Sequence, residues 1–302
     1  MSITQRPPSA RDSRQLLADP AMTAHSPGEE FAQAASLDGG GENFSVRFRG
    51  YLPTAFPLFA ERPRYTVRQL LNMATVRDDE KATPFVGEAA GECGTASGTS
   101  YESTLEAGFD PALLSADHTE LSVSLRVPTG LLAHPRLLSS FIDRRLLVRV
   151  GVRENHTLLH GSADGVIAGL LRLPELRRLD VGGGELVSSV TAAAAHVEET
   201  GGSCDGVVAH PSLYWQMVDS GLLDSLGAAG IRVARTRMMP PHQLLLGDFR
   251  AAATLLDPAD SSLSLHRGAA PDGGDLIEAR CRIALAVHLP QHFVLVGTEE
   301  AA

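Results

Sequence analysis

Two histidines near the end of the chain have the spacing of metal ligands on one helix face. His288 and His292 are four residues apart, as the two histidines of a zinc-binding helix are. Pro290 lies between them and would break such a helix, and no glutamate follows the first histidine. We therefore interpret both as ordinary core or surface histidines and predict no metal site.

Other reactive residue types lack the neighbours that catalysis needs. Gly182, Gly183 and Gly184 could approach a phosphate, but the Lys-Ser/Thr end of a phosphate loop and the spaced glycines of a dinucleotide fingerprint are absent. A hinge is the favoured interpretation of these glycines. Cys93 lies in a glycine-rich segment with no histidine close to it in the sequence, and no G-x-S-x-G elbow occurs. We predict that the chain is not an enzyme and has no catalytic residue, cofactor or metal.

Two groups of charged residues could contact a partner. The acidic residues 78–80 could bind a cation or a basic protein, although a solvated surface is the favoured interpretation. A basic stripe could bind an anion or pair with carboxylates of an adjacent subunit, and it consists of Arg144, Arg145, Arg149 and Arg153. The sequence leaves both alternatives for the stripe open.

The composition limits the class of protein. The 302 residues suffice for one large domain or two ordinary ones, and a hydrophobic content of 43% supplies a sizeable core. A formal charge of −10 argues against a general nucleic-acid binder, which would need a clustered basic face. The three cysteines form no C-x-x-C pair, no apolar run is long enough to cross a bilayer, and no signal peptide is visible. These features predict a soluble cytoplasmic protein that does not contact a membrane.

The basic stripe belongs to a segment with a strong helical pattern. Residues 134–161 (HPRLLSSFIDRRLLVRVGVRENHTLLHG) have a proline in the first turn, a glycine at the exit and apolar residues at every third or fourth position. Just before it, residues 120–127 (ELSVSLRV) alternate strictly between apolar and polar, as a half-buried strand does. The sequence therefore predicts a long strand, a tight turn and a long helix in succession.

The segments before this strand contain little material for a core. Residues 1–48 are rich in Ser, Pro, Gly, Ala and charge, so we predict a flexible arm with a short helical piece at residues 11–18. Residues 48–59 are predicted to be extended, and residues 65–76 to form a short helix or strand. Residues 77–118 are acidic and rich in small residues, which predicts either disorder or a two-stranded loop that projects from the body and is ordered against a neighbour. A weak alternation at residues 99–105 supports the two-stranded loop.

After the long helix, helices and strands alternate loosely, which predicts an α+β fold. Helices are expected at residues 184–200 and 211–226, and a polar bulge at residues 257–262. Pro290 is expected to split residues 275–297 into two strands. Further short strands are expected at residues 206–209, 231–234, 243–246 and 253–256.

The order of these elements resembles the major capsid protein fold that tailed phages and encapsulins share, the Hong-Kong-97-like capsid fold. The similarity runs from about residue 51 to residue 296. It rests on the strand that leads into the long helix, on LLHGSADGVIAGLL after that helix, and on VVAHPSLYWQMVD. The run GIRVARTRMMPPHQLLLGDFRAAATLL looks like this family's strand, linker, returning strand and Gly-Asp-Phe turn, and EARCRIALAVHLPQHFVLV resembles its closing strands.

The resemblance implies a division of the chain into six parts. In chain order these are a flexible N-terminal arm (1–48), its continuation with the start of the peripheral domain (49–76), an extended E-loop (77–118), the peripheral domain with a long spine helix (119–164), an axial domain (165–270) and the closing strands of the peripheral domain (271–302). Pores in this family lie where loops of the axial domain meet, so residues 182–184 and 220–230 are pore candidates by analogy.

The resemblance also implies a self-assembling shell of icosahedral symmetry. The favoured interpretation is an encapsulin-like nanocompartment in the cytoplasm that encloses a cargo enzyme, because residues 1–48 are too short and too proline-rich for the cleaved helical segment of many phage capsid proteins. The alternative is the major capsid protein of a phage or prophage, which packages DNA in a virion. The expected partners are copies of the chain itself and a cargo enzyme, with no sequence-specific contact to nucleic acid.

Two further points bear on this interpretation. Covalently cross-linked members of the family join a loop lysine to an asparagine near the end of the chain. Lys81 is available here, but the last asparagine is Asn155, so we predict that this chemistry is absent. A stand-alone enzyme with a mobile acidic loop is a third hypothesis, from a different class of protein.

Overall fold

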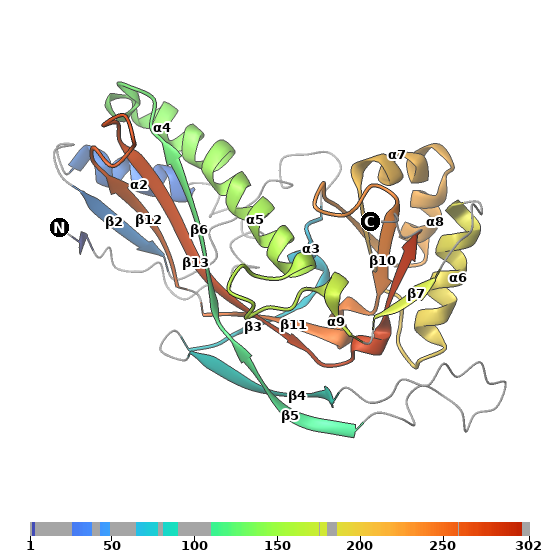
Figure 1. Ribbon diagram of the computed structural model, residues 1–302. Coiled ribbons are helices and arrows are strands. Elements are labelled where there is room, and N and C mark those ends of the chain that lie inside the picture. Colours follow the sequence, from blue (N-terminus) through green and yellow to red (C-terminus); the bar gives the residue numbers. More distant parts are fainter. Residues whose placement is uncertain are drawn as a thin grey trace.

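The computed structural model describes residues 2–3, 26–37, 43–48, 65–77, 81–89, 110–174, 176–179, 186–258 and 260–297. A long sheet with a helix across it lies at one end of the molecule, a smaller sheet with its helices lies at the other end, and a hairpin projects below them (Figure 1). Helices and strands are mixed without a regular βαβ repeat, which confirms the predicted α+β class.

The strand β13 (Leu276–Val287) is the centre of the larger sheet. It pairs antiparallel with β6 (Thr119–Arg126) along one edge, and with β12 (Ser261–His266) and then β11 (Ala253–Asp257) along the other. The sheet continues from β12 to β2 (Phe44–Phe48) and β1 (Ser2–Ile3), and from β11 to β3 (Asn72–Thr75). Alternate residues of β13 are buried, which gives this sheet one apolar face; they are Ile277, Ala279, Cys281 and Ile283.

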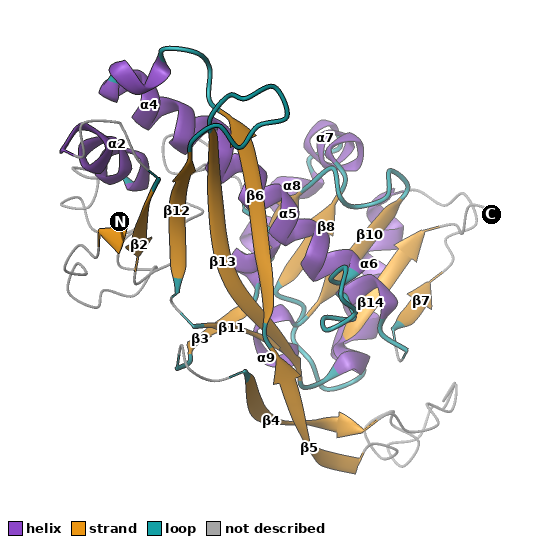
Figure 2. Ribbon diagram, turned by 60° about the vertical axis from the view of Figure 1, so that its left-hand side comes forward, coloured by secondary structure: helices purple, strands orange, loops and turns teal. Residues whose placement is uncertain are grey.

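The spine helix crosses the apolar face of this sheet (Figure 2). It consists of α4 (Pro135–Phe141), a π-helical turn over Ile142–Leu146 and α5 (Leu147–His160). Pro135 is its first residue, and Gly161 ends it with a φ of 94°, so the helix predicted over residues 134–161 is confirmed. The π turn was not predicted, because the apolar pattern continues through it: Ile142 and Leu146 are both completely buried.

The smaller sheet contains five strands of the described chain. Their order is β7 (Arg177–Leu179), β14 (Phe293–Gly297), β10 (Gln243–Gly247), β8 (Gly206–Ala209) and β9 (Arg232–Arg235). The helices α6 (Leu186–Glu198), α7 (Pro211–Asp219) and α8 (Leu222–Ala228) pack against it and share its core (Figure 1). The single helix predicted over residues 211–226 is in fact two, because Gly221 between them has a φ of 71°.

Several shorter elements connect these bodies. The hairpin that projects consists of β4 (Ala82–Ala89) and β5 (Asp110–Asp117). Two one-turn helices, α3 (Val67–Leu70) and α9 (Phe249–Ala252), precede β3 and β11. Residues 65–76 thus contain both a helical turn and a strand. Three 3₁₀ turns cover Leu131–Ala133, Leu170–Arg172 and Pro290–His292.

The prediction of a flexible arm over residues 1–48 is wrong for its later part. The helix α2 (Pro27–Leu37) packs on α4, and β2 is a strand of the larger sheet. Phe31, Phe44 and Val46 are almost completely buried, and the rings of Phe31 and Phe44 lie 4.8 Å apart. A few well-placed apolar side chains are therefore enough to fix a segment whose average composition is polar.

Two strands of the later chain pair outside the group of elements with which they were expected. Residues 257–262 were expected to form a polar bulge in the axial domain, but β12 begins at Ser261 and, like β11, belongs to the larger sheet. Conversely β14, expected among the closing peripheral strands, pairs with β10 in the smaller sheet. The chain crosses between the two sheets at α9 and again at the 3₁₀ turn over Pro290–His292. The segments predicted at residues 11–18, 48–59 and 99–105 lie outside the described residues.

Candidate functional site

The β4–β5 hairpin exposes apolar side chains on a ribbon that projects from the body (Figure 1). Its register runs from Ala82 opposite Asp117 to Ala89 opposite Asp110. Val86 and Leu113 lie directly opposite each other and are 60% and 78% exposed. A two-stranded ribbon cannot bury such a pair by itself. This surface therefore has the chemistry of an intermolecular contact.

The base of the hairpin is attached to the end of β13. The carbonyl oxygen of Val86 accepts a hydrogen bond from Nδ1 of His288 at 2.7 Å, and the Glu88 backbone N–H donates to the His288 carbonyl oxygen at 2.9 Å. A Cβ atom at Gly87 would lie 2.9 Å from the carbonyl oxygen of Val287, so only glycine permits this close approach. Next to this contact a small apolar cluster closes the joint, formed by Phe85, Ala116, Leu256, Ala284 and Ala286.

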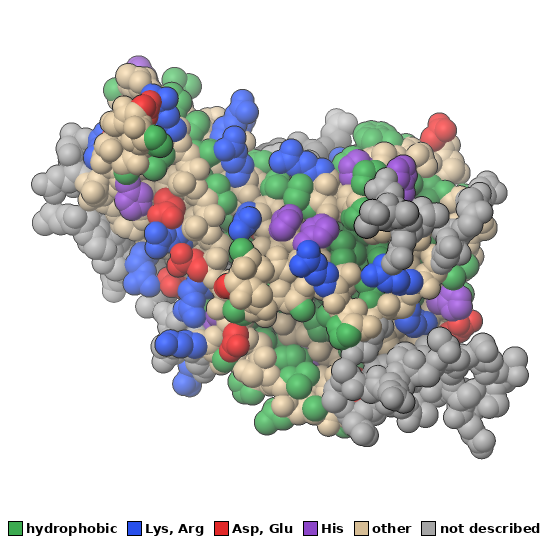
Figure 3. Space-filling model, viewed as in Figure 1, with side chains coloured by type: hydrophobic (Ala, Val, Ile, Leu, Met, Phe, Trp, Pro, Cys, Tyr) green, Lys and Arg blue, Asp and Glu red, His purple; other side chains and the backbone are tan. Residues whose placement is uncertain are grey.

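The basic stripe lies on the solvent side of the spine helix. Its four arginines are exposed, whereas Leu146, Val150 and Leu158 on the opposite side are completely buried. In the space-filling view, basic and histidine side chains follow the spine helix across the middle of the visible face (Figure 3). The predicted helical stripe is thus present on the surface, and its partner is considered below.

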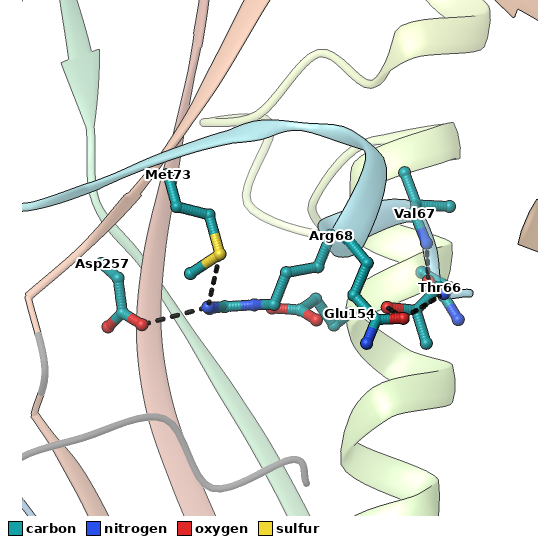
Figure 4. A network of polar contacts seen from close by, with 8 residues as sticks. Thr66, Val67, Arg68, Met73, Glu154 and Asp257 are labelled. Carbon is teal, nitrogen blue, oxygen red and sulfur yellow. Dashed lines mark hydrogen bonds and ion pairs between the residues drawn. The ribbon is translucent and has the colours of Figure 1, made fainter. Parts of the chain in front are cut away.

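A buried polar network connects α3 to the spine helix and to β11 (Figure 4). The guanidinium of Arg68 forms ion pairs with Glu154 at 2.9 Å and with Asp257 at 3.1 Å. All three side chains are less than 10% exposed. The Val67 backbone N–H donates to Oδ1 of Asn155 at 3.1 Å, which satisfies a free donor at the start of α3. The network therefore fixes three segments that are distant in sequence.

Sequence comparisons and fold comparisons give different results. No protein-family profile and no curated protein matches this chain. A virus-like particle from Pyrococcus furiosus matches with a TM-score of 0.53 and 10% identity, over 77% of this chain and 92% of that one. The capsid of a native GTA particle matches with a TM-score of 0.51 and 15% identity, over 82% and 94%. A structure of Mycobacterium phage Adephagia matches with a TM-score of 0.57 and 15% identity, again over 82% and 94%.

The chain has the Hong-Kong-97-like capsid fold. Similarity that covers more than nine-tenths of each of these chains shows that the capsid fold extends through both sheets and is not limited to one motif. Residues 77–118 were predicted to be either disordered or a two-stranded loop. The part of this segment that the structure describes contains two paired strands, β4 and β5. No helix in the described part of the capsid fold is both long and apolar enough to cross a bilayer.

Of the residues considered for chemistry in the sequence, the structure describes the two histidines, Lys81 and Asn155. His288 holds the hairpin, with Nε2 3.0 Å from the Thr254 hydroxyl, and His292 is buried with Nε2 3.0 Å from the Thr200 carbonyl oxygen. Among the described residues, no group of three possible metal ligands occurs. Lys81 is exposed and Asn155 is buried. Residues 78–80, Cys93 and the glycines at 182–184 lie outside the described residues.

An exposed aromatic residue on the smaller sheet was missed by the sequence analysis. Trp215 of α7 is 58% exposed, and the guanidinium of Arg235 lies 4.4 Å from the ring centre of Tyr214 and 5.8 Å from that of Trp215. The signal was present in the sequence, since Trp215 is the only tryptophan. Residues 220–221 and 229–230 are exposed turns that follow α7 and α8, within residues 220–230, which were named by analogy as a pore candidate.

Proposed function

We propose that this chain is a self-assembling shell protein whose copies form a closed icosahedral compartment. The supporting observation is the combination of the capsid fold with a projecting hairpin whose exposed apolar pair, Val86 and Leu113, has no cover in the part of the chain that the structure describes. Covering one such aliphatic side chain contributes about 1.5–3 kcal/mol. Repeated at each subunit contact of a shell, a gain of this size stabilises assembly.

We further propose that the compartment is of the encapsulin type and encloses a cargo enzyme in the cytoplasm, with no catalytic role for the shell itself. This proposal is supported by the proline-rich composition of residues 1–48 and by the likeness to the virus-like particle from Pyrococcus furiosus. The second candidate is a phage capsid protein in a virion, which is supported by the likeness to Mycobacterium phage Adephagia. The ratio of absorbance at 260 and 280 nm of purified particles separates protein contents from packaged DNA.

The assembly claim is tested by removing the apolar pair on the hairpin. The double variant Val86→Ser/Leu113→Ser should shift the protein from large particles to unassembled subunits in sedimentation velocity. Leu137→Ser is the matched control, because Leu137 is 59% exposed on α4 and its loss removes a similar apolar area elsewhere. If the double variant still forms the same particles, the hairpin is not part of the assembly contact. An equal loss in the control would show a general sensitivity to surface apolar area.

A further inference from the structure

Five arginines at the spine helix have no ionic partner. Among the described residues, none of their side chains forms an ion pair or a hydrogen bond; they are Arg144, Arg145, Arg149, Arg153 and Arg172. The absence is notable because the chain carries 36 acidic residues against 26 basic ones. The one carboxylate beside the stripe, Asp143, instead accepts hydrogen bonds from the Ser26 hydroxyl and from the Gly28 backbone N–H.

The arginines form a row and not a compact cluster. Arg145, Arg149 and Arg153 follow one another at four-residue spacing, which places successive side chains about 6 Å apart along the helix axis. The row continues to His156 and His160, whose rings lie 5.0 Å apart, and Arg172 follows on the turn that packs against α5. Gly151 lies within this stretch and leaves open space beside it.

The charge around His156, toward the end of the spine helix, is positive. The pKa of His156 is lowered, first by burial and then by the positive charges of His160, Arg153 and Arg172. No carboxylate appears among the charges that act on this ring. In Figure 3 the acidic side chains of the visible face lie mostly on its left side and at its right edge, whereas basic and histidine side chains follow the spine helix. A protein of net charge −10 therefore carries a basic stripe along one helix, which is one of the forms that a nucleic-acid-binding surface takes.

A second copy of this chain offers no obvious match to the row. No helix in the described part of the chain carries three carboxylates at four-residue spacing, and many of the described carboxylates already hold arginines or cap helices, among them Asp257, Asp260, Asp272 and Asp275. A polymer with one negative charge per repeat unit fits a row of evenly spaced cations better than an isolated anion does. Guanidinium groups bind phosphate oxygens through forked hydrogen bonds.

We propose that this basic row of the spine helix binds the phosphate backbone of nucleic acid without reading its sequence. Contacts of this kind to phosphate oxygens position a nucleic acid and carry no information about its sequence. The proposal concerns the surface of a single chain and does not depend on shell assembly or on the contents of a shell.

The test is the salt dependence of binding to a fluorescein-labelled oligothymidylate of 20 nucleotides, followed by anisotropy on the full-length protein. The four arginines of the row, each with one phosphate contact, predict a slope of about −2.8 for log K against log[salt], or an affinity about 50-fold lower at 200 mM than at 50 mM salt. Arg149→Gln/Arg153→Gln removes two of these contacts, so its slope should fall to about −1.4 and its loss of affinity over the same range to about sevenfold.

The matched control removes the same charge elsewhere. Arg47→Gln/Arg126→Gln changes two exposed arginines that already pair with Asp260 and Asp272, and it should keep the slope of the unaltered protein. The proposal is overturned if both double variants have the same slope or if the unaltered protein does not bind. It is equally overturned if a polyglutamate peptide displaces the oligonucleotide at equal charge concentration, since the row would then prefer carboxylates. Far-UV circular dichroism confirms that each variant is folded.

Discussion

Replacement of Arg68 by methionine would leave two carboxylates close together in the core without their cation. Arg68 is 4% exposed, Glu154 is 1% exposed and Asp257 is 6% exposed, so water cannot replace the lost guanidinium. Removal of one partner from a buried ionic group costs about 3–5 kcal/mol, mainly because the remaining charges stay desolvated. We therefore expect Arg68→Met to lower the free energy of unfolding by that amount, which is a large part of the stability of a typical domain.

The assay is urea unfolding of unassembled subunits, followed by circular dichroism at pH 7. Arg47→Met is the matched control, because Arg47 forms an ion pair of the same length with Asp260, 2.9 Å, but its side chain is 59% exposed. An exposed pair contributes about 0–1 kcal/mol, so the control should be close to the unaltered protein. If Arg68→Met and Arg47→Met lower the stability equally, the buried network does not hold α3, the spine helix and β11 together as we argue.

Four further outcomes follow from the described residues. Burial raises the pKa of the Cys204 thiol to about 11 and raises the pKa of the Cys281 thiol further still. Iodoacetamide at pH 8 should therefore label neither thiol in the folded protein and both thiols in guanidinium, which peptide mass spectrometry can check. As the pH rises, the Cys204 thiol ionises in the unfolded chain before it ionises in the folded protein. Its contribution to stability should therefore be constant below pH 9 and fall by about 1.4 kcal/mol per pH unit up to pH 11. Rapid labelling of the folded protein at pH 8 would contradict the raised pKa. Gly169→Ala should lower the melting temperature much more than Gly165→Ala, since both residues have positive φ but only at Gly169 would the new Cβ meet backbone atoms, at 2.3 Å. Asp143→Ala should cost about 1–2 kcal/mol and make α2 sensitive to limited proteolysis, because two hydrogen bonds at the start of α2 are lost; unchanged resistance would mean that the apolar contacts of α2 suffice.

The strongest local patterns in the sequence predicted the structure well. The strand over residues 120–127 and the spine helix after it have long, regular apolar periods, and each period matches a single buried face. The proline and glycine at the ends of the helix mark its limits for steric reasons that do not depend on the rest of the fold. The order of elements then led to the capsid fold, although no short motif was specific enough to identify it alone.

The errors occur where long-range packing outweighs local composition. Residues 27–37 look like part of a polar arm, and only the tertiary contacts of Phe31 with Phe44 and with the rest of the core make them a stable helix. In β12 the polar residues Ser262, Ser264 and His266 alternate with Leu263 and Leu265, which are buried in the sheet between β13 and β2. Sheet membership of β11, β12 and β14 depends on partners far away in the chain, so no local pattern reports it.

The two candidate surfaces, the arginine stripe and the hairpin, could also be predicted only in part from the sequence. The sequence indicated the arginine stripe, because helical spacing alone decides which residues share a face. It did not indicate that these arginines lack carboxylate neighbours, that His156 and Arg172 extend the row, or that Val86 and Leu113 meet as an exposed pair. These facts depend on which elements pack side by side.

The most direct test of the central claim is the particle mass of the purified full-length protein. Mass photometry of freshly prepared protein at physiological salt measures it without labels, and negative-stain microscopy shows the shape of the same sample. We expect closed particles of megadalton mass with regular outlines, in which the hairpin of each subunit is covered by a neighbour. A uniform population with the mass of a single chain, stable on concentration, would contradict the claim that this capsid fold assembles into a shell.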